Sequence, residues 1–362
     1  MRKSLGLVYL SLAAALAADK HAGGPMAVKV TSRSAMVVCV VETGSATLTA
    51  ASDTTAISAP ALRANKHGFT GLKPGTVYNY DCGSGGQQGS FKTVPAKPEP
   101  FDFVVFGDTR TRHDMHRRIV SGILKTGSPD FVLHTGDLVS DGTDSAQWPV
   151  FFDIERDLLS KTAFFPALGN HERNSRQFYE YFDVESPYYS FNWGDSHFIV
   201  LNSDLGNIAL SRAAKEEFWT RQRKWLEEDL VASAKAQFRF VIAHHPPITA
   251  VTRRQGDNPE MTALIPLFEK HRLTAGFFGH DHNYQHYLRE GIHYVVTGGG
   301  GAPLYDVANP PAGITVKVVS TEHFVKVHIE NDVATMTAVG IDGAELDKFE
   351  VRAAAPAITA GN

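Results

Sequence analysis

FVVFGDTR, residues 103–110, and FVLHTGD, residues 131–137, share one design. In each stretch a short apolar run leads into Gly-Asp, so a buried strand would carry a carboxylate, Asp108 or Asp137, to its own carboxyl end. Ligands of open α/β sheets bind beyond the carboxyl ends of the strands. We therefore expect the two carboxylates to lie at one edge of one sheet.

The stretches between the apolar runs have helical character. Helices are expected near His113–Lys125, near Ser145–Leu159 and over Glu216–Ala234, where apolar residues recur at helical spacing. Residues 322–351 return to a strand pattern, which indicates a sheet that closes the domain. Strands that alternate with helices predict packed α/β layers over residues 101–353.

The amino-terminal segment has the pattern of a secretory signal peptide. In MRKSLGLVYLSLAAALAADK, a short basic region precedes the apolar run Leu5–Leu16, which is too short to span a bilayer comfortably. Ala15-Leu16-Ala17 fits a cleavage site. We predict that residues 1–17 are removed and that the protein is secreted or periplasmic, with no stable membrane anchor; an uncleaved N-terminal anchor is the alternative.

Residues 25–95 have a strand-and-turn pattern without the helical stretches of the rest of the chain. Their β-branched runs, separated by Gly and Ser turns, predict a small all-β sandwich, and AKPEP at 96–100 reads as a linker. The two cysteines, Cys39 and Cys82, both fall here in strand-like contexts. A disulfide and two free buried thiols both fit this placement. Residues 354–362 are predicted to be a flexible tail.

Composition narrows the function classes. A length of 362 residues with 43% hydrophobic side chains is ordinary for a globular protein, and a net charge of −4 predicts no stable nucleic-acid partner. Nine of the 16 histidines lie between His244 and His328. Histidines clustered near carboxylates favour metal binding, whereas single histidines are more often surface or core residues.

Five short motifs carry the chemistry. They are FGD at 106–108, TGD at 135–137, GNHE at 169–172, HHPP at 244–247 and GHDH at 279–282. Each alone could be a turn, a strand end or a core histidine, but such roles do not explain all five in this order after apolar runs. Two Asp carboxylates, an Asn carbonyl and several imidazoles are the ligands expected for Zn, Fe or Mn.

The order and content of these motifs resemble the calcineurin-like metallophosphoesterase family. LKPGTVYNYDCG and GSFKTVP in the β-rich region look most like the purple acid phosphatase branch, with its fibronectin-III-like N-terminal domain. The resemblance covers roughly residues 25 to 350. It implies a four-layer α/β sandwich, in which two packed mixed β-sheets are flanked by helices and preceded by the small all-β domain.

The resemblance also implies a centre of two metal ions, Fe, Zn or Mn, held by six side chains: Asp108, Asp137, Asn170, His244, His280 and His282. Asp137 would bridge the metals, Asp108 and His282 would hold the first, and Asn170, His244 and His280 would hold the second. His171 would donate a proton to the leaving group or clamp the phosphate, with Glu172 orienting it. Asn170 would also face the substrate, and His245 would lie just outside the ligands.

Two positions depart from the family pattern. Arg110 stands where the wider family carries a histidine ligand, and an always-protonated arginine is no normal ligand. The first metal would then have one protein ligand fewer, or His113 or His116 would substitute; Arg110 itself suits a phosphate contact. Ser140 stands where purple acid phosphatases carry a tyrosine, so a ferric first site would lack one anionic ligand.

Two further features lie among the motifs. GGGG at 298–301 is expected to let the backbone approach the metal site closely, and it is no nucleotide loop because no helix pattern with Lys-Ser/Thr follows. Arg253 and Arg254 either meet a second phosphate or acidic group of the substrate or form a solvated basic pair.

The implied function is a dinuclear phosphoesterase that hydrolyses small phosphate monoesters by attack of a metal-bound hydroxide. A phosphodiesterase that acts on nucleotides or glycerophosphodiesters is the alternative within this class. A non-catalytic protein that binds a phosphoryl ligand or a surface on the same scaffold is the alternative from another class, since a fold does not fix a function.

Overall fold

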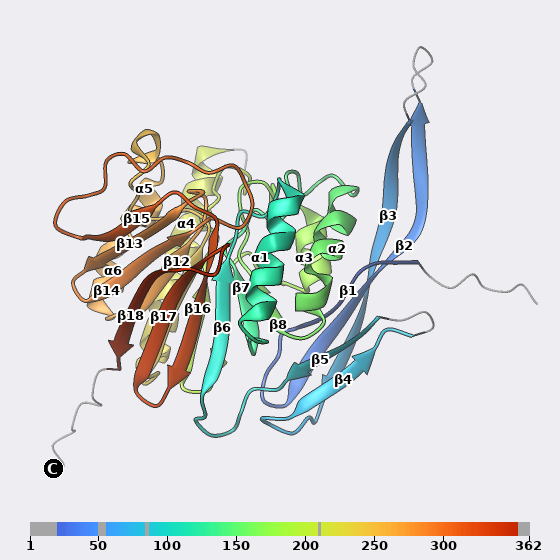
Figure 1. Ribbon diagram of the computed structural model, residues 1–362, viewed down its shortest axis with the longest axis horizontal. Helices are drawn as coiled ribbons and strands as arrows, with labels where there is room; N and C mark the ends of the chain where they lie inside the picture. Colours follow the sequence, from blue (N-terminus) through green and yellow to red (C-terminus); the bar gives the residue numbers. More distant parts are fainter. Residues whose placement is uncertain (1–19, 50–55, 84–86, 209–210, 354–362) are drawn as a thin grey trace, which may run out of the picture.

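The computed structural model describes residues 20–49, 56–83, 87–208 and 211–353. The predicted signal peptide, residues 1–17, and the predicted tail, residues 354–362, lie outside these ranges. Two sheets pack face to face, and helices cover the outer face of each, so that four layers result (Figure 1). The predicted fold class is confirmed.

The larger sheet has nine strands. From one edge to the other they are β18 (Glu345–Arg352), β17 (Val333–Gly340), β16 (His323–Glu330), β6 (Phe101–Phe106), β7 (Phe131–His134), β8 (Ala163–Pro166), β1 (Lys20–Val28), β2 (Ser34–Thr49) and β3 (Ala56–Thr70). β6, β7 and β8 are parallel, with Phe103 opposite Phe131 and Phe131 opposite Ala163. Their carboxyl ends therefore meet at one edge of the sheet.

The smaller sheet has seven strands. In spatial order they are β15 (Thr315–Val319), β13 (Tyr284–Arg289), β14 (Ile292–Thr297), β12 (Ala275–Phe278), β11 (Phe238–Ala243), β10 (Ser196–Val200) and β9 (Tyr189–Trp193). β10, β11, β12 and β14 are parallel, so this sheet also gathers carboxyl strand ends at one edge.

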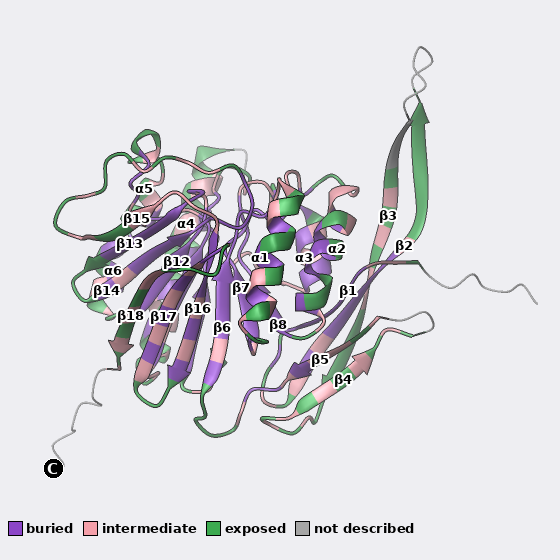
Figure 2. Cartoon of the chain, in the orientation of Figure 1, coloured by how far each residue is buried: buried purple, intermediate pink, exposed green. Residues whose placement is uncertain are grey.

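Three apolar cores hold the layers together. Aromatic side chains fill the space between the sheets, where Phe103 packs on Phe131 at 5.0 Å and edge-on against Phe198 at 5.3 Å. A second core packs the larger sheet against α1 (His113–Lys125), α2 (Gln147–Leu159) and α3 (Arg176–Phe182). A third packs the smaller sheet against α4 (Arg212–Ala232), α5 (Pro259–Thr262) and α6 (Ile265–Lys270). Figure 2 shows the central strands buried along most of their length.

The N-terminal region is all-β and is joined to the larger sheet. β1 pairs with β8 in parallel through Ala27 and Ala163, so β1, β2 and β3 extend that sheet, and β2 with β3 forms an arm that projects from the body (Figure 1). β4 (Val77–Asp81) and β5 (Gln88–Lys92) form a separate two-stranded sheet. A disulfide between Cys39 and Cys82 ties β2 to the end of β4.

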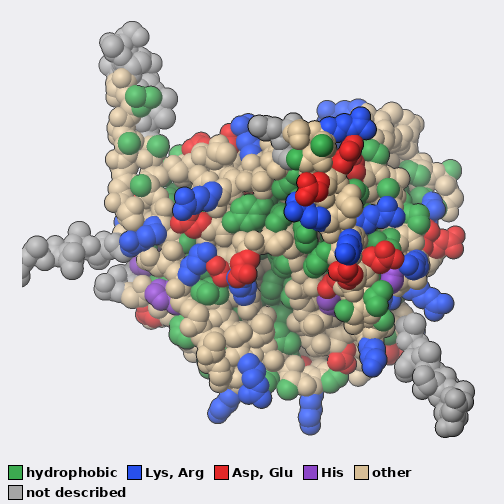
Figure 3. Space-filling view, turned by 180° about the vertical axis from the view of Figure 1, so that it is seen from behind, with side chains coloured by type: hydrophobic (Ala, Val, Ile, Leu, Met, Phe, Trp, Pro, Cys, Tyr) green, Lys and Arg blue, Asp and Glu red, His purple; other side chains and the backbone are tan. Residues whose placement is uncertain are grey.

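The surface carries mixed charge. On the face in Figure 3, Lys and Arg side chains are interspersed with Asp and Glu, and no continuous patch of one sign covers it. None of the helices in the described ranges is both long enough and apolar enough to cross a membrane.

Candidate metal centre

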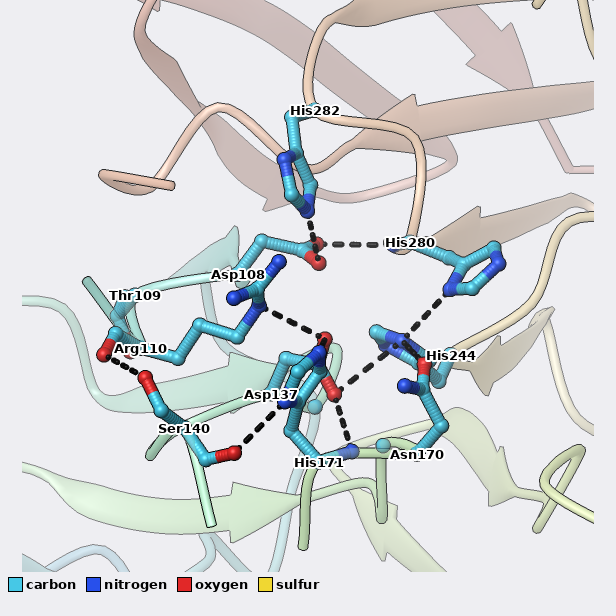
Figure 4. A network of polar contacts seen from close by, with 12 residues as sticks. Asp108, Thr109, Arg110, Asp137, Ser140, Asn170, His171, His244, His280 and His282 are labelled. Atoms are coloured by element: carbon cyan, nitrogen blue, oxygen red, sulfur yellow. Dashed lines mark hydrogen bonds and ion pairs between the residues drawn. The ribbon is translucent and has the colours of Figure 1, made fainter. Parts of the chain in front are cut away.

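Loops from both sheets meet at the carboxyl ends of their parallel strands. Asp108, Asp137 and Asn170 follow β6, β7 and β8, while His244 follows β11 and the pair His280 and His282 follows β12. Figure 4 shows the six side chains turned toward one another. The structure therefore brings together all six residues that the sequence predicts as metal ligands.

Asp108 and His282 form one side of this group. His282 Nε2 lies 3.3 Å from Asp108 Oδ1, and both side chains are almost fully buried. The other ring nitrogen, Nδ1, lies 2.7 Å from the Pro303 carbonyl oxygen and donates to it, which leaves Nε2 free to act as a ligand. Asp108 Oδ1 is buried and accepts no hydrogen bond from the described residues.

His244 is the centre of the other side. Its Nε2 lies 3.0 Å from Asn170 Oδ1, 3.1 Å from His280 Nδ1 and 3.4 Å from Asp137 Oδ1. Nδ1 donates to the Thr135 carbonyl oxygen at 2.9 Å, so Nε2 again faces inward as a lone pair. Two imidazoles, a carboxylate and an amide oxygen thus direct lone pairs at one another. Such acceptors repel at these distances unless a proton or a cation lies between them.

The donor set therefore fits metal ions. Ligand atoms of Asp108, Asp137 and His244 lie within 4.8 Å of one another, and so do those of His244, His245 and His280. Nitrogen and carboxylate ligands of this kind suit Zn, Fe and Mn. The orphaned, buried Asp108 Oδ1 would gain the partner that it lacks among the described residues.

Backbone strain marks the ligand loops. Asp108, Asp137 and His280 have φ values of 61°, 57° and 68°, a left-handed conformation that costs a residue with a Cβ atom about 1 kcal/mol or more. Gly279 precedes His280, and a Cβ atom there would lie 2.6 Å from Asp108 Oδ2. Such strain clusters at functional sites, where the surrounding structure holds it in place.

The glycine run at 298–301 lies against the first of these loops. Gly300 N donates to the Gly107 carbonyl oxygen at 3.0 Å, and Ala302 N donates to that of Asp108 at 2.8 Å. A Cβ atom on Gly298 would lie 2.8 Å from Asp108 Oδ2. The run approaches the site as closely as the sequence led us to expect.

His171 sits at the open side of the centre. Its Nδ1 donates to the Ser140 carbonyl oxygen at 2.7 Å, and its Nε2 lies 3.9 Å from Asp137 Oδ2 (Figure 4). The side chain is 31% exposed, so a substrate can reach it. His171 therefore presents Nε2 toward Asp137 from a solvent-accessible position.

The resemblance led us to expect that Glu172 orients His171, but the Ser140 carbonyl oxygen does so instead. The buried Glu172 carboxylate accepts hydrogen bonds from the backbone N–H groups of Asp137, Leu138 and Gly169 at 2.7 to 2.8 Å, and from that of Val139 at 3.3 Å. It holds the two ligand loops together. The sequence pattern could not reveal this role, because its partners are backbone groups.

Arg110 enters the centre from the side of β6. Its Nε lies 3.4 Å from Asp137 Oδ2, and its side chain is 16% exposed. That Nε is buried and makes no hydrogen bond with the described residues, so the guanidinium keeps donors for an anion.

The two histidines near Arg110 do not replace the missing ligand. His113 is exposed on α1. His116 is buried, and its Nε2 pairs with Glu155 Oε1 at 2.6 Å. His245 lies beside the ligands: its ring packs on that of His280 at 4.0 Å, and its Nδ1 faces Ser203 Oγ at 2.9 Å.

Charge and burial set the protonation of the ligands. Burial would raise the pKa of Asp108, but His282, His244 and the backbone N–H of His280 outweigh it and lower the pKa. Burial, followed by the charges of His245, His244 and Arg254, holds the pKa of His280 well below its usual range. These directions favour an ionised Asp108 carboxylate and a neutral His280 imidazole, the forms that bind metal ions. For His244, burial is outweighed by the charges of Asp137 and Asp108, which raise its pKa.

Comparison with known proteins places the chain in a family. Residues 101–284 match the model of the family described as calcineurin-like phosphoesterase. The chain belongs to this family. The predicted resemblance is confirmed, and the matched segment contains all six predicted metal ligands.

Named relatives agree with the predicted enzyme class, a metal-dependent phosphoric ester hydrolase. The chain is 29% identical to purple acid phosphatase 21 of Arabidopsis thaliana over 60% of its own length and 51% of the relative. It is 27% identical to a nucleotide pyrophosphatase/phosphodiesterase of Hordeum vulgare, over 50% and 60% of the two chains. The chain thus spans about half the length of the curated purple acid phosphatases that it matches.

A solved structure shows the same fold. The purple acid phosphatase PPD1 from yellow lupin (Lupinus luteus) seeds superposes with a TM-score of 0.73, at 16% sequence identity, over 92% of this chain and 75% of that one. The superposition extends well beyond the segment matched by the family model, so it takes in the β-rich N-terminal region as well.

Proposed function

We propose that this protein is a dinuclear-metal phosphoesterase that hydrolyses small phosphate monoesters. The observation that carries the proposal is the convergence of six inward-facing ligand side chains with donor atoms 3.0 to 3.4 Å apart. The family and the purple acid phosphatase relative support the reaction class.

Two divalent or trivalent cations held by these residues would neutralise the phosphoryl charge and activate water as the nucleophile. Asp108 and His282 would hold one cation, and Asn170, His244 and His280 the other, with Asp137 between them. The left-handed backbone at Asp108, Asp137 and His280 fixes the direction of three ligands in advance.

The chain's own residues supply orientation and proton transfer. Arg110, whose buried Nε has no hydrogen-bond partner among the described residues, would hold a phosphoryl oxygen beside Asp137, and the side-chain amide of Asn170 would face the substrate. His171 would donate from Nε2 to the leaving oxygen, since its Nδ1 is fixed on the Ser140 carbonyl. Protonated His171 is the form that can make this donation.

Hydrolysis of phosphodiesters is the second candidate function, and the match to the nucleotide pyrophosphatase/phosphodiesterase of Hordeum vulgare supports it. Non-catalytic binding is less well supported, because no side chain of the six-ligand set is missing. We also propose export from the cytoplasm. The Cys39–Cys82 disulfide supports it, since disulfides persist in oxidising compartments.

The test is phosphate release by the purified protein supplied with Zn, Mn or Fe. We expect turnover of 4-nitrophenyl phosphate to exceed that of bis(4-nitrophenyl) phosphate, and Asp137→Asn to reduce kcat/KM at least about 100-fold. Faster turnover of the diester would favour the phosphodiesterase. Absence of turnover of both esters with every metal would contradict the proposal.

A further inference from the structure

A pair of arginines lies one side chain away from the metal ligand His282. The Tyr305 ring stacks on the His282 imidazole, with ring centres 4.1 Å apart and planes 20° apart. The guanidinium carbons of Arg253 and Arg254 lie 4.4 and 4.9 Å from the centre of the same Tyr305 ring. Both are within cation–π range, so Tyr305 links the two positive charges to the metal centre.

Two loops hold this arrangement in place. Tyr305 N donates to the His282 carbonyl oxygen at 3.0 Å, which fixes the tyrosine against the ligand. The loop of Arg253 and Arg254, which includes η1 (Thr252–Arg254), is tied to the loop of Tyr305 by Asn309. Asn309 Nδ2 donates to Thr252 Oγ1 at 2.7 Å, and Gln255 Nε2 donates to the Asn309 carbonyl oxygen at 2.9 Å. These hydrogen bonds hold the loop of Arg253 and Arg254 in place against the loop of Tyr305.

The charge of the pair is only partly compensated. Arg254 Nη1 lies 3.6 Å from Asp281 Oδ1, and Arg254 is 17% exposed. Arg253 is exposed, and no carboxylate pairs with it in the part of the chain that the structure describes. A net positive charge with free guanidinium donors remains beside the metal centre, and planar forks of this kind bind carboxylate and phosphate.

Tyr305 lies between the arginine pair and the ligand His282, in contact with both. A small molecule with its phosphoryl group at the metal centre could therefore reach the pair with another part of the same molecule.

We propose that Arg253 and Arg254 form a subsite for a second anionic group of the substrate. The preferred substrates are phosphate esters whose leaving group carries a carboxylate or another phosphate. This inference rests on the proposed phosphoesterase function and specifies its substrate class. A solvated basic pair would give the same exposure but no preference between substrates.

The test compares matched substrates that differ in the second anion. Glycerol 3-phosphate and 3-phosphoglycerate carry the same primary phosphate ester, and the second has a carboxylate where the first has a hydroxymethyl group. Fructose 6-phosphate and fructose 1,6-bisphosphate differ by one phosphate. The measured quantity is the ratio of kcat/KM for the two-anion substrate to that for the one-anion substrate. We expect a ratio of about 10 or more for one pair, because a charge-assisted contact contributes that much.

Arg253→Gln should lower this ratio about tenfold, and Arg253→Lys should retain part of it because the charge remains. Arg221→Gln is the matched control, since Arg221 is 65% exposed on α4 and pairs with Glu217 at 3.7 Å. A wild-type ratio near one for both pairs, or a ratio that Arg253→Gln leaves unchanged, would overturn the subsite alone. If the wild type hydrolyses 4-nitrophenyl phosphate but none of the four substrates, the subsite alone is overturned. If it hydrolyses neither the nitrophenyl esters nor any of the four substrates with any metal, the phosphoesterase is overturned and the subsite with it.

Discussion

Replacement of Arg110 by alanine tests how the centre holds a phosphate. Arg110 Nε is buried, lies 3.4 Å from Asp137 Oδ2, and has no hydrogen-bond partner among the described residues. A phosphoryl oxygen would supply that partner. A hydrogen bond between charged groups contributes about 2 kcal/mol, so we expect Arg110→Ala to lower kcat/KM about 30-fold. Because the contact forms with the ground-state phosphate as well, the loss should appear mainly in KM.

The assay combines steady-state kinetics on 4-nitrophenyl phosphate with metal analysis of the same preparations. Arg117→Ala is the control, because Arg117 lies on α1, is 53% exposed and pairs with Asp153 at 2.7 Å. The metal content of Arg110→Ala should equal that of the wild type. A loss of metal would show that Arg110 positions Asp137 instead, and an unchanged KM would refute the phosphate contact.

Three further predictions concern the neighbours of the metal centre. Glu172→Ala leaves four backbone N–H groups without their acceptor and should lower the free energy of unfolding by about 3 kcal/mol in urea titrations; a loss below about 1 kcal/mol would contradict its role. His171→Ala should reduce kcat about 100-fold for glycerol 3-phosphate but much less for 4-nitrophenyl phosphate, whose leaving group needs no proton; equal losses would exclude proton donation. Burial lowers the pKa of His323 from 6.5 to about 4, so the folded state binds fewer protons and stability should fall as the pH drops from 6.5 toward 4. Between pH 7 and pH 5, His323 should account for a loss of about 2 kcal/mol in the free energy of unfolding, and His323→Phe should lack this loss. Equal losses in the wild type and the variant would contradict this role of His323.

The metal ligands could be predicted because each follows a strand. The carboxylates follow FVVF and FVLH, and the histidines follow FVIA and TAGFF. These side chains can converge only if the strands are parallel. Parallel strands need long crossover connections, and the helical stretches between the strands supply them. The helix at His113–Lys125 has the predicted bounds, since its apolar spacing is regular and Gly127 follows it. The local sequence patterns therefore predicted both the α/β layers and the candidate metal centre.

Features that depend on backbone groups or single pairings could not be predicted. β1 joins the larger sheet through one residue pair, Ala27 with Ala163, which leaves no pattern in the sequence. β3 contains Arg63, Asn65 and Lys66 and lacks a regular apolar alternation, so its sequence does not predict a strand. The carbonyl oxygens that orient the histidines belong to residues of no special type, so their roles appear only in three dimensions.

Metal content per chain tests the central claim most directly. Protein purified without chelators and analysed for Fe, Zn and Mn should contain about two metal ions per chain. His244→Ala should lose at least one of them, because that imidazole faces three other ligand groups. A value near one in the wild type would mean that Arg110 takes the place of the first metal. A value near zero that persists after metals are added back would contradict the dinuclear phosphoesterase.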